Sequence, residues 1–287
     1  MRRCRTAWFV LIALVAGCSS AAHRATSSVT DPTTLPTTTT STTVAPTTVA
    51  PTTTTRPHTT TTRPAVPTAA SSVCQANLAD SISNTYSAHQ LVTVESSVYT
   101  TDVANVALWQ KSGSCWGMVA GPWSGYIGYN GFSDHKQEGD GKSPTGIYGF
   151  GPVIYGNASD PGVNETYHLL VCGDWWDEAS SSADYNTFQH VANAANPCTT
   201  TSPWGDPDSE ALWTEKAPYP SFAVINYNTG PIVAGAGSAI FLHASTGGAT
   251  AGCVSVPLSD LDYFLRWMQP SQDPLIVMGP AGEIARF

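Results

Sequence analysis

The chain has 287 residues, of which 12 are Lys or Arg and 21 are Asp or Glu, and its net charge at pH 7 is −9. Nucleic-acid binding requires clustered basic residues, so this composition argues against a nucleic-acid partner. After its N-terminal segments are set aside, the chain is long enough for one large domain or two small ones.

The N-terminus has the pattern of an export signal. Three arginines among the first five residues precede an apolar stretch over 7–16 that is too short to span a bilayer. The sequence Leu-Val-Ala-Gly-Cys ending at Cys18 then indicates a lipoprotein cleavage site, although an ordinary secretory signal is an alternative. We therefore expect a signal peptide over 1–17 and an exported protein whose Cys18 carries a lipid anchor in the cell membrane.

The segment over 18–70 lacks the pattern of a folded domain. It consists largely of Thr runs interrupted by Pro, and its few large apolar side chains cannot offset the entropy lost on ordering. About 45 residues of extended polyproline chain would reach roughly 140 Å. We predict a disordered tether that raises a folded domain over 71–287, with its core at about 91–279, from the membrane toward a cell wall.

The pattern of this domain is mainly β. Short apolar runs, several with alternating polarity, predict strands at 90–94, 106–110, 115–119, 126–129, 167–172, 222–226, 240–243 and 274–279. One helix is expected from an N-cap at Ser259 to Pro270, because apolar residues follow at helical spacing. A weaker helix is expected over 77–89.

Five cysteines lie in the expected domain, and an exported protein tends to oxidise its spare thiols. Four can pair and one is left over. The sequence does not fix the connectivity, but we favour Cys74–Cys115 and Cys172–Cys198, which leaves Cys253 free. No Cys or His spacing typical of a zinc site is present, so no metal is expected.

His243 and Cys253 lie ten positions apart in strand-like apolar runs near the C-terminus. An imidazole can activate a thiol as a base or by stabilising the thiolate. Gly252, directly before Cys253, would allow a tight turn that presents backbone N–H groups to an oxyanion. The alternative is a buried structural cysteine near an unrelated histidine.

Two motifs in this order resemble those of the YkuD-like L,D-transpeptidases. Asp-Gly-Lys-Ser-Pro-Thr-Gly at 140–146 resembles the glycine-rich Thr-Pro-x-Gly turn of that family. His243, followed by Thr-Ala-Gly-Cys-Val at 250–254, resembles the family's later His and Ser/Thr-His-Gly-Cys signature. The resemblance covers about 91–278, and it implies a β-sandwich or barrel-like catalytic domain with a few short helices.

Two positions depart from the family pattern. Ala251 stands where the family usually has His, and Ser255 stands where it usually has Arg. The His-to-Cys spacer is also shorter than in common members. The chain therefore resembles a divergent, actinobacterial-type secreted branch, and the departures leave open its acyl donor and the balance between transfer and hydrolysis.

The resemblance implies a cysteine acyltransferase that modifies peptidoglycan stem peptides, needs no cofactor and is a monomer. The nucleophile Cys253 would attack the carbonyl of a diamino acid and release the terminal D-alanine. An amine of a neighbouring stem would then resolve the thioester. His243 would act as the general base and acid.

The resemblance also implies the groups that assist this pair. The backbone carbonyl of Ala244, or less strongly Ser245, would orient the histidine. Backbone N–H groups of Gly252 and Cys253, together with that of Ala251, would form the oxyanion hole.

Other interpretations remain open. The same residues could serve an L,D-carboxypeptidase or endopeptidase that hydrolyses the stems, or the chain could be a wall-binding lipoprotein without activity. The carboxylates of Asp-Trp-Trp-Asp-Glu at 174–178 could line a groove for the amine of a diamino acid, but we favour a solvated loop with core tryptophans.

Overall fold

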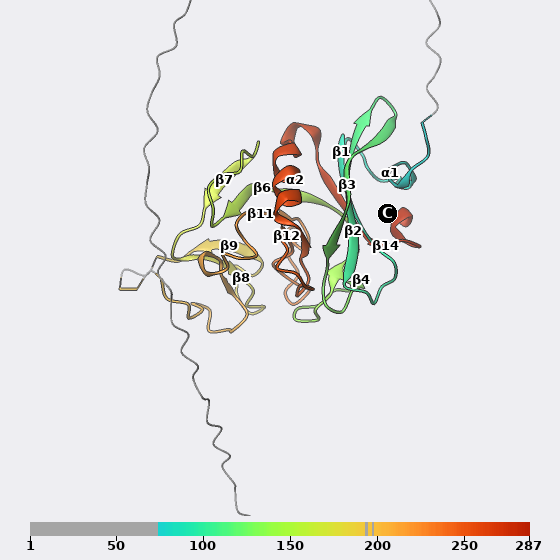
Figure 1. Cartoon of the computed structure of the whole chain (residues 1–287). Coiled ribbons are helices and arrows are strands. Elements are labelled where there is room, and N and C mark those ends of the chain that lie inside the picture. Colours follow the sequence, from blue (N-terminus) through green and yellow to red (C-terminus); the bar gives the residue numbers. More distant parts are fainter. Residues whose placement is uncertain (1–73, 193–194, 197) are drawn as a thin grey trace, which may run out of the picture. The chain divides into compact units, whose positions relative to one another are not determined.

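The structure, a computed structural model, describes residues 74–192, 195–196 and 198–287 (Figure 1). The expected signal peptide over 1–17, the expected lipidation site Cys18 and the expected tether over 18–70 lie outside the described residues. Within the described ranges, no helix combines the length and the apolar character needed to cross a membrane.

Eight strands close into a barrel. They are β1 (Gln90–Ser96), β2 (Val103–Ser112), β3 (Cys115–Tyr126), β6 (Gly146–Gly156), β11 (Phe222–Ile225), β12 (Phe241–Ala244), β13 (Val254–Val256) and β14 (Leu275–Pro280). Their order is β11-β12-β13-β3-β2-β1-β14-β6, and the pairing of β6 with β11 completes the ring. The ninth strand of this sheet, β7 (Thr166–Leu169), pairs with β6 outside the ring. The fold is therefore mainly β, as the sequence predicts.

Smaller elements surround the barrel. A two-stranded sheet joins β4 (Phe132–Ser133) and β5 (Ser143–Pro144), and a three-stranded sheet has the order β10-β8-β9. The strands of the latter are β8 (Asp174–Asp177), β9 (Thr187–His190) and β10 (Glu210–Ala211). The helices are α1 (Leu78–Ser81), α2 (Leu258–Trp267) and three short 3-10 turns at Leu212–Thr214, Pro270–Gln272 and Ile284–Arg286.

Three local predictions need correction. The helix expected over 77–89 is only the four-residue α1, because the backbone becomes extended at Ile82. Helix α2 begins at Leu258, so Ser259 is not its N-cap; Pro257 holds that position without a side-chain cap bond. The strand expected over 126–129 is absent from the described structure, because β3 already ends at Tyr126.

Alternation along β12 and β13 divides their side chains between two cores. Leu242 and Val254 belong to the main hydrophobic core, together with Leu261 and Phe264 of α2. In a strand, successive side chains point to opposite faces. The opposite face of β12 therefore presents Phe241 to a second core, which is rich in aromatic side chains and contains Cys253.

The structure contains the two favoured disulfides, Cys74–Cys115 and Cys172–Cys198, with Cα–Cα distances of 5.3 Å and 4.7 Å. Cys253 is the free cysteine of the described residues. The first bond fastens the segment before α1 to the start of β3. The connectivity favoured from the sequence is thus confirmed.

We predict the same connectivity in the protein produced by an oxidising compartment. Alkylation without reduction, followed by proteolysis and mass spectrometry, should give two cross-linked peptide pairs, 74 with 115 and 172 with 198. Cys253 should carry the alkyl group. A cross-link that includes Cys253 would contradict this assignment.

Candidate active site

The parallel pairing of β12 with β13 brings His243 and Cys253 to one face of the sheet. In the register, Leu242 lies opposite Val254, and His243 lies opposite Ser255. Because side chains alternate, the residue before Val254 points to the same face as His243. His243 in β12 and Cys253, the residue directly before β13, therefore lie on the same aromatic-rich side of the barrel wall.

Cys253 is 9% exposed, and its sulfur has two backbone partners. The thiol donates to the Ala239 carbonyl at 3.1 Å, and the Phe241 N–H donates to the sulfur at 3.3 Å. In the described residues, no hydrogen bond joins Cys253 Sγ to the imidazole of His243. The resting thiol is thus held by the backbone before β12 rather than by its predicted base.

The surroundings of Cys253 favour the neutral thiol. Burial raises the pKa of this thiol well above its usual range, and the negative charge of Glu210 raises it further. The hydrogen bond from the Phe241 N–H and the charge of Lys136 lower it only in part. Activation therefore requires that a base or a bound ligand offset both burial and negative charge.

His243 is buried and neutral. Its Nδ1 lies 2.9 Å from the Ala244 carbonyl, which can only accept, so Nδ1 carries the proton and Nε2 is left as the basic nitrogen. Burial lowers the pKa of His243 to about 4, although the carbonyls of Ala244 and Pro218 oppose the shift. The structure thus places the Ala244 carbonyl where the resemblance expects the orienting group. Ser245 instead accepts a hydrogen bond from the Gly247 N–H.

Tyr219 connects the histidine to a buried carboxylate. Its ring contacts the His243 ring edge-on, with centroids 5.4 Å apart, and its hydroxyl donates to Glu210 Oε2 at 2.8 Å. Burial raises the pKa of Glu210 to about 7, opposed by the bond from Tyr219. No motif in the sequence points to Glu210.

The loop that carries Cys253 is fixed by the predicted 140–146 turn. Ser143 Oγ donates to the Gly252 carbonyl at 2.6 Å and accepts from the Gly128 N–H at 2.9 Å. Gly252 has a φ of +156°, and a Cβ there would lie 2.9 Å from the Lys142 carbonyl. The two sequence motifs are therefore in direct contact, and glycine is required at the junction.

The predicted oxyanion donors differ in availability. The Gly252 N–H already donates to Thr250 Oγ1 at 3.1 Å, and the Thr250 hydroxyl donates to the Cys253 carbonyl at 2.6 Å. No side chain among the described residues accepts from the N–H of Ala251 or Cys253. Of the three predicted donors, these two are the better candidates.

A cavity of about 400 Å³ opens beside Cys253. Its walls include Gly252, Ala251 and several charged side chains: Lys136, Glu138, Glu178, Asp208 and Glu210. The prediction of a solvated loop over 174–178 is wrong, because Asp174 to Asp177 form the buried strand β8, although its tryptophans are core residues as expected. Of this segment, only Glu178 lines the cavity. Most of these charges come from separate segments, so no local motif could have grouped them.

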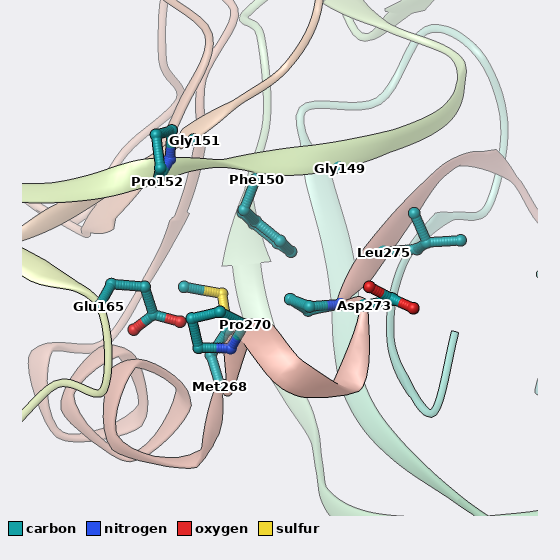
Figure 2. Close-up of a pocket in the computed structure, with 10 residues that line it drawn as sticks. Gly149, Phe150, Gly151, Pro152, Glu165, Met268, Pro270, Asp273 and Leu275 are labelled. Atoms are coloured by element: carbon teal, nitrogen blue, oxygen red, sulfur yellow. The ribbon is translucent and has the colours of Figure 1, made fainter. Parts of the chain in front are cut away.

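A second cavity, of about 340 Å³, lies between β6, β14 and the end of α2 (Figure 2). Phe150, Met268 and Leu275 line it together with the carboxylates of Glu165 and Asp273 (Figure 2). None of the ten residues that line it is a Cys, His, Ser or Lys. Because it offers no nucleophile or nitrogen base, we assign the chemistry to the cavity beside Cys253.

Comparison of the chain with known proteins finds no matching family model, curated protein or solved structure. The site must therefore be interpreted from its own geometry. That geometry is a free thiol that lines a cavity with an excess of carboxylates, and a neutral imidazole on the neighbouring strand β12 that is not among the residues lining this cavity.

A matched pair of Ser→Ala substitutions tests the support of the cysteine loop. Ser143→Ala should lower the free energy of unfolding by about 1–3 kcal/mol, because it leaves the Gly252 carbonyl and the Gly128 N–H without their partner. Ser255→Ala should leave it unchanged or raise it, because the buried Ser255 hydroxyl has no partner. Urea denaturation of both variants measures the difference, and equal losses would contradict the assignment.

Removing negative charge near Cys253 should make its thiol more reactive. Glu178→Gln and Glu210→Gln each remove a carboxylate that raises the thiol pKa. At a fixed pH the thiolate fraction should grow about tenfold for each unit of pKa lost. Mass spectrometry of Cys253 alkylation by iodoacetamide measures this rate. Glu283→Gln removes an exposed carboxylate outside the cavity and should react like the wild type; equal rates in all variants would refute the electrostatic explanation.

Proposed function

We propose that this protein is a cysteine acyltransferase of the L,D-transpeptidase type that acts on peptidoglycan stem peptides. The observation that carries the proposal is the free thiol of Cys253 beside a cavity, on the same sheet face as the neutral imidazole of His243. Nucleophile, base and backbone N–H donors are the groups that acyl transfer through sulfur requires. The sequence resemblance and the expected export add support.

The proposed first step acylates the cysteine. The thiol turns from the Ala239 carbonyl toward the cavity, and His243 Nε2 takes its proton as the sulfur attacks the scissile carbonyl. Because the pKa of His243 is low and that of the thiol is high, no stable ion pair forms first, and proton transfer accompanies attack. Collapse of the tetrahedral intermediate breaks the C–N bond, and His243 returns the proton to the departing amine of D-alanine.

The proposed second step resolves the thioester. A neutral amine attacks the thioester carbonyl, the C–S bond breaks, and His243 transfers a proton from the attacking nitrogen to the sulfur. Water in place of the amine gives hydrolysis by the same sequence. The hydrolase alternative therefore differs only in the second nucleophile.

Acylation of the thiol is the direct test of this proposal. The purified protein, incubated with a disaccharide tetrapeptide or with meropenem, should gain the mass of the acyl group on Cys253. Cys253→Ala should gain none, and His243→Ala should acylate about 10²- to 10⁴-fold more slowly, because it lacks the base. Intact-mass spectrometry measures both.

The control is folding. Circular dichroism of Cys253→Ala and His243→Ala should match that of the wild type. If folded wild-type protein forms no adduct with either compound, the enzyme proposal fails and a non-catalytic wall-binding role takes its place. Cross-linked products would indicate transfer, and free tripeptide would indicate hydrolysis.

A further inference from the structure

Acidic side chains outnumber basic ones in the wall of the cavity beside Cys253. Glu138, Glu178 and Glu210 line it, and Lys136 is the one cation among the described residues of its wall. Lys136 Nζ is already engaged, because it lies 2.7 Å from Asp140 Oδ1 and 3.0 Å from the Gln137 carbonyl. No ion pair in the described part of the chain involves any of the three glutamates.

The protein satisfies these carboxylates only in part. Both oxygens of Glu138 have donors, because Oε2 accepts from Ser238 Oγ at 2.6 Å and from the Tyr185 hydroxyl, and Oε1 accepts from the Gly139 N–H at 3.3 Å. Glu210 Oε2 accepts from the Tyr219 hydroxyl at 2.8 Å. Glu178 Oε2 receives only the long contact of 3.4 Å from Ser238, and Glu178 Oε1 is buried without a hydrogen-bond partner. A buried, unpartnered carboxylate oxygen is costly, so this cavity is incomplete without a donor from outside.

The missing partner is a cation that donates hydrogen bonds. Burial raises the pKa of Glu178 and of Glu210, and neighbouring carboxylates raise it further. A positive charge in the cavity would stabilise both carboxylates and lower these pKa values. No group of His, Cys, Asp or Glu in the described residues is arranged to hold a metal ion. An ammonium group offers three N–H donors on a flexible stem and can reach carboxylates that are too far apart to chelate one ion.

We propose that the cavity beside Cys253 is a binding subsite for a primary ammonium group, held by Glu138, Glu178 and Glu210. Ammonium binding itself is independent of the proposed acyl transfer, and only the source of the group depends on that function. The ammonium belongs either to the side chain of the acyl donor or to the amine that accepts the acyl group. Both sources share the chemistry that the cavity recognises.

Binding is tested with a small probe on the full-length protein. Nα-acetyl-lysine methylamide carries the ammonium, and its Nε-acetylated analogue is a neutral control of similar shape. The charged probe should bind in an NMR titration, whereas the acetylated probe should not. Equal effects of both probes, or tighter binding of the guanidinium analogue Nα-acetyl-arginine methylamide, would overturn the proposal.

Paired variants assign the binding to the glutamates. The double variant Glu178→Gln/Glu210→Gln should bind the charged probe about tenfold more weakly or worse, because it removes two of the three proposed carboxylates. A tenfold loss of affinity corresponds to about 1.4 kcal/mol of binding free energy. Glu283→Gln, which removes an exposed charge outside the cavity, should bind like the wild type. Undiminished binding by the folded double variant would refute the subsite.

The source of the ammonium is then decided by kinetics. If acylation of Cys253 slows when the donor's side-chain amine is acetylated, and the slowing disappears in the double variant, the group belongs to the donor. If the ratio of amine transfer to hydrolysis falls in the double variant, it belongs to the acceptor. Failure of Cys253 to acylate at all would refute the proposed function, while the probe titration would still decide the subsite.

Discussion

The parallel pairing of β12 with β13 is the constraint on which the rest of the site depends. It sets His243 opposite Ser255, and alternation then directs the thiol of Cys253 and the imidazole to one face while Leu242 and Val254 fill the main core. If β13 shifted by one residue against β12, its side chains would turn to the other face, and the thiol and the imidazole would lie on opposite sides of the sheet. Because the same strands bury core residues at 0% exposure, the packing that stabilises the barrel also fixes the geometry of the candidate site.

The loop before β13 depends on contacts that reach across the sequence. Ser143 lies 109 residues before Gly252, yet its hydroxyl holds the carbonyl of that glycine. This contact joins the upstream turn to the cysteine loop and explains in physical terms why the two motifs occur together. The turn has no chemistry of its own in this arrangement; its role is to hold the backbone from which the thiol and the oxyanion donors project.

The sequence predicted what local patterns encode and missed what only the folded chain brings together. The presence of one free thiol among five cysteines and the apolar alternation of β1 were predictable because each depends on composition or periodicity, whereas the disulfide connectivity was only favoured. Strand β6 was missed because Gly149, Gly151 and Pro152 interrupt its alternation, although pairing on both sides holds it in the barrel. The acidic cavity could not be predicted, since its three glutamates lie far apart in the sequence: Glu138 between β4 and β5, Glu178 directly after β8, and Glu210 at the start of β10.

The acidic cavity and the resting thiol are coupled by the same charges. Burial, and then the carboxylates of Glu210 and Glu178, raise the pKa of the Cys253 thiol, so the unliganded protein holds a neutral, weakly nucleophilic sulfur. The thiolate is the species that oxidants attack, and a neutral thiol is the safer resting state in an oxidising compartment. A bound ammonium would offset the negative charge and lower the thiol pKa, and by reciprocity the thiolate would strengthen ammonium binding. The arrival of the proposed ligand would then be the event that makes the nucleophile reactive.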